Sequence, residues 1–244
     1  MNSCKNLSFN MNILLTAIGS MSALCAINNL HKAGHKVIGC DIYPKEWHYE
    51  ASQCDVFEQA PYANTEEYIP FLLKLAKEND VKYLFPLTDL EIDVINPKRE
   101  LFEQEGITVC ISSRETLKIA RNKYSLFKAF KDDETVPSVP TYTLEDDLTK
   151  LKYPCVAKPR DGRSSEGLCY LQNENQLNEI KHISSYIFQE KIEGSVCTVD
   201  YVRDPLTGCS FCVPREELLR TKNGAGTTVR IFHNAKLESL VKYI

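Results

Sequence analysis

A lysine at the end of an apolar strand, followed directly by a loop of small and polar residues, carries the clearest chemical meaning in this sequence. Residues 155–157 predict a short buried strand that ends in Lys158, and residues 168–171 predict the return strand. The loop 161–167 between them contains Gly162, Arg163, Ser164, Ser165 and Gly167. Small side chains leave backbone N–H groups bare, and Lys158 and Arg163 add positive charge, so this segment predicts a phosphate cradle. The alternative is an ordinary hairpin with a solvated tip, but such a hairpin would not require a lysine directly before the loop.

A second apolar strand, predicted at 186–190, ends in the polar segment Glu190, Lys191, Ile192 and Glu193. A strand end that leaves main-chain N–H and C=O groups unpaired can bind the edge of an adenine ring through hydrogen bonds. Many strands end in polar residues, so this signal is weak when taken alone.

The first 110 residues alternate predicted strands with predicted helices, which is typical of a doubly wound parallel sheet. Strands are expected at 12–18, 35–41, 81–86 and 107–110, and helices from about residue 20 to 30, at 65–79 with Thr65 as N-cap, and at 88–104.

The turn 16–22 predicts an anion site at a helix N-terminus, and Asp41 stands where a ribose-binding acid would stand. The turn lacks the G-x-G-x-x-G spacing, so a nicotinamide-dependent oxidoreductase is the weaker alternative. Asp89 and Glu91 follow another strand, either as ligand-binding acids or as first-turn acids of a helix capped by Thr88.

The pattern changes after a helix predicted at 113–131, with Ser113 as N-cap, and an extended connector at 136–140 that contains two prolines. Strands predicted at 155–158, 168–171 and 186–190, a helix at 174–182 and a hairpin of 196–203 with 209–214 indicate an antiparallel α+β unit. We therefore expect two domains, residues 1–112 and residues 113–244.

Composition excludes several classes of protein. The 244 residues have a formal net charge of −4, 43% hydrophobic and 25% charged residues, and no basic stripe that would indicate a nucleic-acid partner. No apolar run approaches membrane-spanning length, and the first residues do not resemble a signal peptide. Most of the ten cysteines lie inside apolar patterns, which favours reduced thiols and a cytoplasmic location.

The order of these motifs resembles the ATP-grasp superfamily from about residue 12 to residue 244, most closely the branch of carbamoyl-phosphate synthase large-chain domains and related carboxylate–amine ligases. Segment 121–123 resembles the family's Asp-Lys element, with Lys123 toward the nucleotide phosphates and Asn122 in place of the aspartate. Lys158 resembles the lysine of the Lys-Pro element, 161–167 the mobile glycine-rich loop, and 190–193 the adenine hinge with the residue after it. Arg215 and Arg230 resemble the basic residues near the transferred phosphate, and would act in catalysis.

The resemblance implies a Rossmann-like pre-ATP-grasp domain followed by an ATP-grasp domain that phosphorylates a small carboxylate with ATP for attack by an amine. Two departures concern residues: Ser164 replaces a common glycine, and Ser195 stands where the family has an acid. Beyond the helix predicted at 235–243 the family has two strands with Mg²⁺ ligands, which this sequence lacks. We therefore expect an ATP-grasp domain incomplete at its C-terminus and without metal ligands of its own. The alternative to a ligase is a non-catalytic protein or one completed by a second polypeptide.

Overall fold

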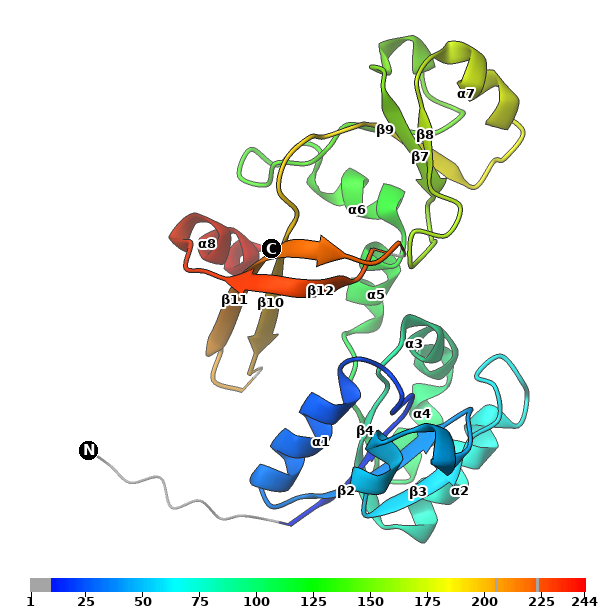
Figure 1. Cartoon of the computed structure of the whole chain (residues 1–244), viewed down its shortest axis with the longest axis vertical. Helices are drawn as coiled ribbons and strands as arrows, with labels where there is room; N and C mark the ends of the chain where they lie inside the picture. Colours follow the sequence, from blue (N-terminus) through cyan, green and yellow to red (C-terminus); the bar gives the residue numbers. More distant parts are fainter. Residues whose placement is uncertain (1–9, 205, 223) are drawn as a thin grey trace. The chain divides into compact units, whose positions relative to one another are not determined.

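The computed structural model describes residues 10–204, 206–222 and 224–244, and the chain divides into two compact units after Arg114 (Figure 1). The structure has the predicted mixed architecture, with a parallel sheet in the first unit and antiparallel sheets in the second. The domain bounds 1–112 and 113–244 stay a prediction.

Within its described residues, the first unit is built on a parallel sheet of five strands in the order β3-β2-β1-β4-β5. Its strands are β1 (Asn12–Leu15), β2 (Lys36–Asp41), β3 (Val56–Gln59), β4 (Val81–Phe85) and β5 (Thr108–Val109). Its helices are α1 (Ala23–Lys32), α2 (Tyr68–Glu78), α3 (Asp89–Ile95) and α4 (Arg99–Gln104). Alternate residues of β1 face different cores: Leu14 packs with α2, and Leu15 packs with α1.

Two expectations for this unit were wrong in detail, and one strand was missed. The helix predicted at 88–104 is divided into α3 and α4 by a 3-10 segment, Asn96–Lys98, because Pro97 cannot continue the α-helical hydrogen bonds. Thr65 does not cap α2, since its hydroxyl donates to the Tyr62 carbonyl in the preceding turn. Strand β3 was not predicted.

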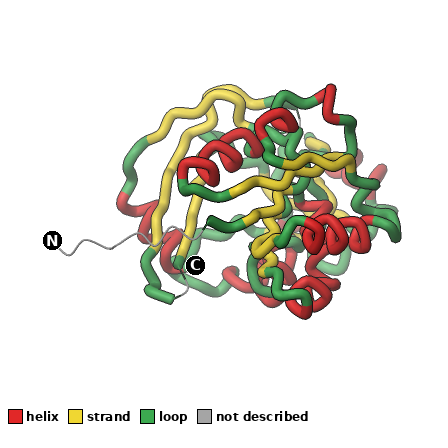
Figure 2. The backbone as a smooth tube through the Cα atoms, turned by 90° about the horizontal axis from the view of Figure 1, so that it is seen from below, coloured by secondary structure: helices red, strands yellow, loops and turns green. Residues whose placement is uncertain are grey.

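The second unit contains two antiparallel sheets, whose strands are yellow in Figure 2. One sheet has the order β6-β9-β7-β8, with β6 (Thr141–Tyr142), β7 (Cys155–Pro159), β8 (Cys169–Leu171) and β9 (Tyr186–Glu190). The other has the order β10-β11-β12, with β10 (Cys197–Arg203), β11 (Ser210–Arg220) and β12 (Gly226–Ile231). The helices are α5 (Arg114–Ala120), α6 (Lys123–Phe130), α7 (Glu174–Ile180) and α8 (Ala235–Tyr243).

Strands β6 and β12 were not predicted, and the hairpin of β10 and β11 extends to Arg220 rather than to residue 214. Pro205, in the predicted turn of this hairpin, lies outside the described residues. Within the described part of the chain, no helix is long and apolar enough to cross a membrane.

The helix predicted at 113–131 is two helices, α5 and α6, separated at Asn122. The Asn122 side chain accepts hydrogen bonds from the backbone N–H groups of Tyr124 (3.1 Å) and Ser125 (3.0 Å), so it caps α6. A new helix therefore begins at Lys123, which places this lysine in a first helical turn.

Replacement of Asn122 by alanine is expected to destabilise the chain by about 1 kcal/mol, because two N–H groups of α6 lose their acceptor. Asn122→Asp is the matched control, since it keeps the acceptor and adds a negative charge at a helix N-terminus. Urea unfolding of the three proteins measures the effect. A loss for Asn122→Asp as large as that for alanine would contradict the capping role.

Candidate functional site

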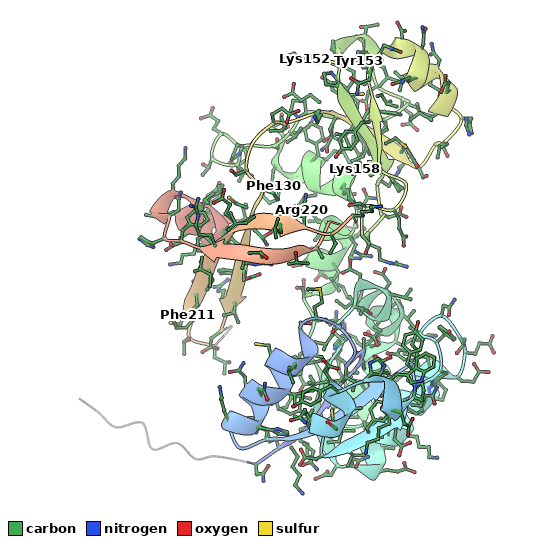
Figure 3. All side chains as sticks on the ribbon, in the orientation of Figure 1. Phe130, Lys152, Tyr153, Lys158, Phe211 and Arg220 are labelled. Carbon is green, nitrogen blue, oxygen red and sulfur yellow. The ribbon has the colours of Figure 1, made fainter. Side chains whose placement is uncertain are left out.

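Strand β7 carries Lys158 on the face of its sheet opposite the hydrophobic core of the unit. Cys155 and Ala157 are fully buried in that core together with Phe188 of β9. Because side chains alternate along a strand, Lys158 lies on the other face with Val156 and its cross-strand partner Ile187. The register of β7 thus sends the lysine out of the core at the end of the strand (Figure 3).

Lys123 joins Lys158 at the start of the loop. Its backbone N–H donates to the Arg160 carbonyl (2.7 Å), and its Nζ donates to the Gly162 carbonyl, so α6 begins against the loop. Burial, and then the charge of Lys123, lower the pKa of the half-buried Lys158. Among the described residues, Lys158 has no hydrogen-bonding or ion-pairing partner. The two ammonium groups therefore repel each other in a place where an anion would stabilise both.

A pocket of about 210 Å³ lies at these two lysines. Its lining includes most of the predicted phosphate loop, and comprises Lys123, Lys158, Pro159, Gly162, Arg163, Ser164, Ser165, Glu166 and Leu168. Three cationic side chains against one carboxylate give the lining a positive balance. The structure thus brings together Lys123 and Lys158, which are 35 positions apart in the sequence.

The loop has a left-handed backbone at its centre. Ser164 (φ +50°) and Ser165 (φ +57°) both adopt the conformation that glycine takes most easily. Gly167 (φ +68°) closes the loop under the Tyr186 hydroxyl, which donates to its carbonyl at 2.7 Å. The serine at position 164 therefore keeps the backbone geometry expected of a glycine. Ser164 and Ser165 line the pocket of the two lysines, where short side chains leave backbone N–H groups accessible to an anion.

We expect ATP to slow tryptic cleavage after Arg163 several-fold, because residues 164–167 are exposed and a bound triphosphate would order them. Cleavage after Lys181, at the end of α7 and away from the pocket lining, serves as the internal control. Mass spectrometry of the fragments over time measures both rates. Equal rates after Arg163 with and without saturating ATP would show that the loop does not cover the nucleotide.

The predicted hinge follows β9. Glu190 pairs with Cys155 and Lys158 pairs with Ile187, so three residues of ladder, about 10 Å, separate the hinge from the lysine. Lys191 donates its backbone N–H to the Pro154 carbonyl (3.0 Å), and its Nζ forms an ion pair with Glu193. Ile192 is 63% exposed. The end of β9 and the apolar side chain of Ile192 therefore lie at a distance from the phosphate pocket that is comparable to the length of a nucleotide.

The two arginines predicted to act in catalysis lie on opposite faces of the three-stranded sheet. Arg215 is opposite Ile231, whereas Arg230 is opposite Glu216, and adjacent residues of a strand point to opposite faces. Arg215 binds Asp200 through two nitrogens (2.8 and 3.3 Å), and Arg230 forms an ion pair with Glu216. A group bound on one face can therefore meet one of these arginines, and the catalytic role of each stays a prediction.

The turn between β11 and β12 also reaches the phosphate loop, a contact that was not predicted. A Cβ atom on Gly224 would lie 2.9 Å from the Ser165 hydroxyl oxygen. The signal that could have located this turn is the pair of glycines, Gly224 and Gly226, between two polar strand ends.

In the first unit, Asp41 occupies the predicted anion site itself. Its carboxylate accepts the backbone N–H of Gly19 (2.9 Å) and of Tyr43 (3.1 Å), and His48 Nε2 lies 3.2 Å away. An acid that already holds the N–H of the first turn is poorly placed to hold a ribose as well, so the oxidoreductase alternative loses its main support.

Glu91 is buried rather than placed at the solvent edge. It accepts hydrogen bonds from the hydroxyls of Tyr68 (2.7 Å) and Thr88 (2.9 Å). Thr88 therefore binds a side chain, and makes no side-chain cap of α3. Asp89 also has a bonding partner, so neither acid offers a clear ligand site.

Two family models match the chain: an ATP-grasp domain over residues 120–243 and a PylC-like N-terminal domain over residues 13–110. A curated relative, the D-alanine–D-alanine ligase of Petrotoga mobilis, is 30% identical over 108 residues, which are 42% of this chain and 36% of the relative. The chain thus aligns with about a third of that protein.

Solved structures show the same fold at low identity. The biotin carboxylase of Campylobacter jejuni has a TM-score of 0.69 and 16% identity, covering 90% of this chain and 54% of its own. The biotin carboxylase domain of Hydrogenobacter thermophilus 2-oxoglutarate carboxylase has a TM-score of 0.67 and 18% identity, and the match covers 87% of this chain and 51% of that chain. Rhizobium etli pyruvate carboxylase has a TM-score of 0.66 and 17% identity, and the match covers 88% of this chain and 21% of that protein.

Proposed function

This chain belongs to the ATP-grasp family, and on that premise we propose that it binds ATP in the pocket of Lys123, Lys158 and the loop 161–167. The observation that carries the proposal is Lys158. It is half-buried, it lies beside a second ammonium group, and it has no partner among the described residues. A triphosphate would supply the negative charge that this arrangement lacks.

Each element of the site has a role in this proposal. Lys123 and Lys158 bind phosphate oxygens, Arg163 adds charge from the loop, and the backbone N–H groups around Ser164 and Ser165 complete the cradle. The adenine lies along residues 190–193, where the main chain after β9 supplies the hydrogen bonds and Ile192 the apolar contact.

The reaction that we propose is the activation of a small carboxylate. Its oxygen attacks the γ-phosphorus of ATP, an acyl phosphate forms, and ADP leaves with the broken bond's electron pair. An amine then attacks the acyl carbon and expels inorganic phosphate. Protein groups contribute positioning and charge stabilisation of the transferred phosphoryl group. Arg215 or Arg230 would contact that group.

The Hydrogenobacter domain was solved with MgADP and bicarbonate, which makes Mg²⁺ a reasonable companion of ATP here. The described residues nevertheless contain no group of three or more His, Cys, Asp or Glu side chains placed to hold a metal ion. Mg²⁺ that is bound together with a nucleotide needs only one or two carboxylates beside the phosphate oxygens, so this observation does not decide between the candidate functions. The second candidate function is nucleotide binding without turnover, or turnover with a second polypeptide.

The two candidates are separated by hydroxylamine trapping. The chain is incubated with ATP, Mg²⁺ and a panel of amino acids and other small carboxylates, and ADP and hydroxamate are measured. A ligase gives both products in equal amounts and only with a suitable carboxylate. ATP binding with neither product would support the non-catalytic or completed-protein alternative, and absence of ATP binding would overturn the proposal as a whole.

A further inference from the structure

We propose that Arg220 is a fourth cation of the phosphate site, beside Lys123, Lys158 and Arg163, and that Glu217 positions it. This inference rests on the proposed function, because the anion that it assigns to Arg220 is the triphosphate of ATP. Glu217 was not among the predicted site residues. The resemblance to the family places Arg220 only among the basic residues near the acceptor phosphate, with Arg215 and Arg230.

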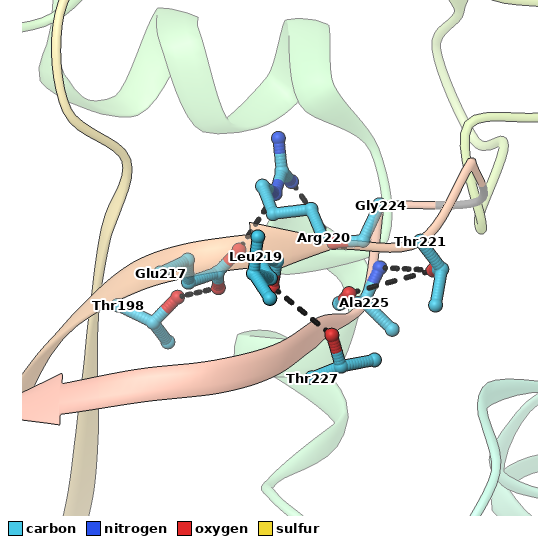
Figure 4. Close-up of polar contacts among 8 residues, drawn as sticks. All are labelled: Thr198, Glu217, Leu219, Arg220, Thr221, Gly224, Ala225 and Thr227. Atoms are coloured by element: carbon cyan, nitrogen blue, oxygen red, sulfur yellow. Dashed lines mark hydrogen bonds and ion pairs between the residues drawn. The ribbon is translucent and has the colours of Figure 1, made fainter.

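A short network of side chains holds Arg220 at the end of β11 (Figure 4). Its Nε lies 2.7 Å from Glu217 Oε2, and its Nη2 donates to the Gly224 carbonyl at 2.9 Å. The other carboxylate oxygen of Glu217 accepts the Thr198 hydroxyl from β10 at 2.7 Å. Among the described residues the remaining nitrogen, Nη1, has no partner, and in Figure 4 it points away from the two strands.

The network lies directly beside the phosphate loop. Arg220 Nη2 and the Ser165 hydroxyl oxygen are both within 3.3 Å of one point, the place that a Cβ atom on Gly224 would take. Ser165 is one of the two left-handed residues of the loop and lines the pocket of Lys123 and Lys158. The guanidinium group thus stands at the edge of the candidate phosphate site, and Figure 3 shows Arg220 and Lys158 in the same part of the second unit.

Glu217 is placed with little freedom. Its side chain is 7% exposed, and a Cβ atom on Gly226 would approach it to 3.0 Å, so the two groups are in close contact across the strands. The hydrogen bond from Thr198, and then the contact with Arg220, lower the pKa of Glu217, which keeps it ionised at neutral pH. Arg220 itself is 43% exposed, and an ion pair so open to water contributes little stability.

The contacts of Arg220 therefore orient its guanidinium group more than they stabilise the fold. An arginine held at Nε and Nη2 before the ligand arrives loses less side-chain entropy on binding a phosphate. Residues three apart on a regular strand point to opposite faces, so Glu217 and Arg220 would not normally meet. The register of β11 and β12 shifts between these two residues, and this irregularity accompanies their contact. By contrast, carboxylates occupy Arg215 and Arg230, which lie farther along the sheet.

Titration calorimetry of the 244-residue chain with inorganic tripolyphosphate, ATP and adenosine tests the proposal. Arg220→Ala is expected to bind tripolyphosphate roughly tenfold to a hundredfold more weakly, the effect of one charge-assisted hydrogen-bonding group. Glu217→Gln, which keeps the size of the side chain, is expected to cost roughly threefold to tenfold. Adenosine binding should not change in either variant. Arg203→Ala is the matched control. Arg203 pairs with Ser210 at the start of β11, whereas Arg220 is at the end of β11, so this variant should bind as the wild type does.

A double-mutant cycle separates positioning from a general structural role. If Glu217 acts through Arg220, then Glu217→Gln has no further effect on tripolyphosphate affinity in the Arg220→Ala background. Equal effects of Glu217→Gln in both backgrounds would overturn the positioning role, and wild-type affinity of Arg220→Ala would overturn the inference. Arg220→Lys keeps a charge and guards against loss of the fold: it should fall between the wild type and alanine.

The outcomes also distinguish this inference from the proposed function. A chain that binds tripolyphosphate through Arg220, but binds neither ATP nor adenosine, would support Arg220 as a phosphate-binding cation and contradict the proposal that the site binds a nucleotide. A chain that binds ATP with no dependence on Arg220 would do the reverse. A chain that binds none of the three would overturn both.

Discussion

Replacing Lys158 by alanine is expected to weaken ATP binding by about 1.5–3 kcal/mol, the range for a hydrogen bond to a charged group. The expectation follows from the site, because Lys158 is the half-buried ammonium group at the mouth of the pocket and has no partner among the described residues. Competition against a fluorescent ATP analogue measures the change.

Lys152→Ala is the matched control for this variant. Lys152 is exposed and precedes β7, whereas Lys158 lies near its end, so the two lysines are separated along the strand (Figure 3). The control should bind ATP as the wild type does. Equal loss in both variants would indicate a general charge effect, and equal affinity of Lys158→Ala and the wild type would remove Lys158 from the site.

Replacing Phe188 by alanine is expected to destabilise the second unit by about 3–5 kcal/mol, the cost of truncating a buried aromatic side chain. Phe188 is fully buried, and it packs with Cys155 and Ala157 across the strand pair that carries Lys158. ATP affinity should fall with it, since the same strand pair positions the lysine. Urea unfolding followed by circular dichroism measures the stability.

Phe211→Ala provides the comparison, because Phe211 lies on β11 with 68% of its surface exposed. Truncation there is expected to change the free energy of unfolding by no more than about 0.5 kcal/mol. Similar losses for Phe188 and Phe211 would show that the core around β7 and β9 does not stabilise this unit as described.

The fold was largely predictable because its strongest signals are local. The continuous apolar run at 12–18 and the alternation of strands and helices specify a parallel sheet, and the structure confirms it. The elements that were missed are short or polar: β6 has two residues, and β12 exposes most of its side chains. Asn122 was taken for a substituted aspartate of the Lys123 element, but its capping bonds divide one predicted helix into two.

The candidate site was predictable in part for a related reason. Lys158 and the loop 161–167 are contiguous in the sequence, so their proximity requires no knowledge of tertiary structure. The position of Arg230 depends on strand register, which places it on the face opposite Arg215. The contact of Glu217 with Arg220 depends on a β-bulge, and the contact of Gly224 with Ser165 depends on how a hairpin meets a distant loop. Strand register, bulges and contacts between distant segments cannot be predicted from the pattern of residue types along the sequence.

The most direct test of the central claim is a calorimetric titration of ATP into the 244-residue chain, with NADH titrated in parallel. We expect saturable binding of one ATP per chain, with no saturable binding of NADH. Lys123→Ala and Lys158→Ala should each bind ATP at least tenfold more weakly, about 1.4 kcal/mol or more. Absence of saturable ATP binding, or binding unaffected by both substitutions, would contradict the claim that this pocket is a nucleotide site.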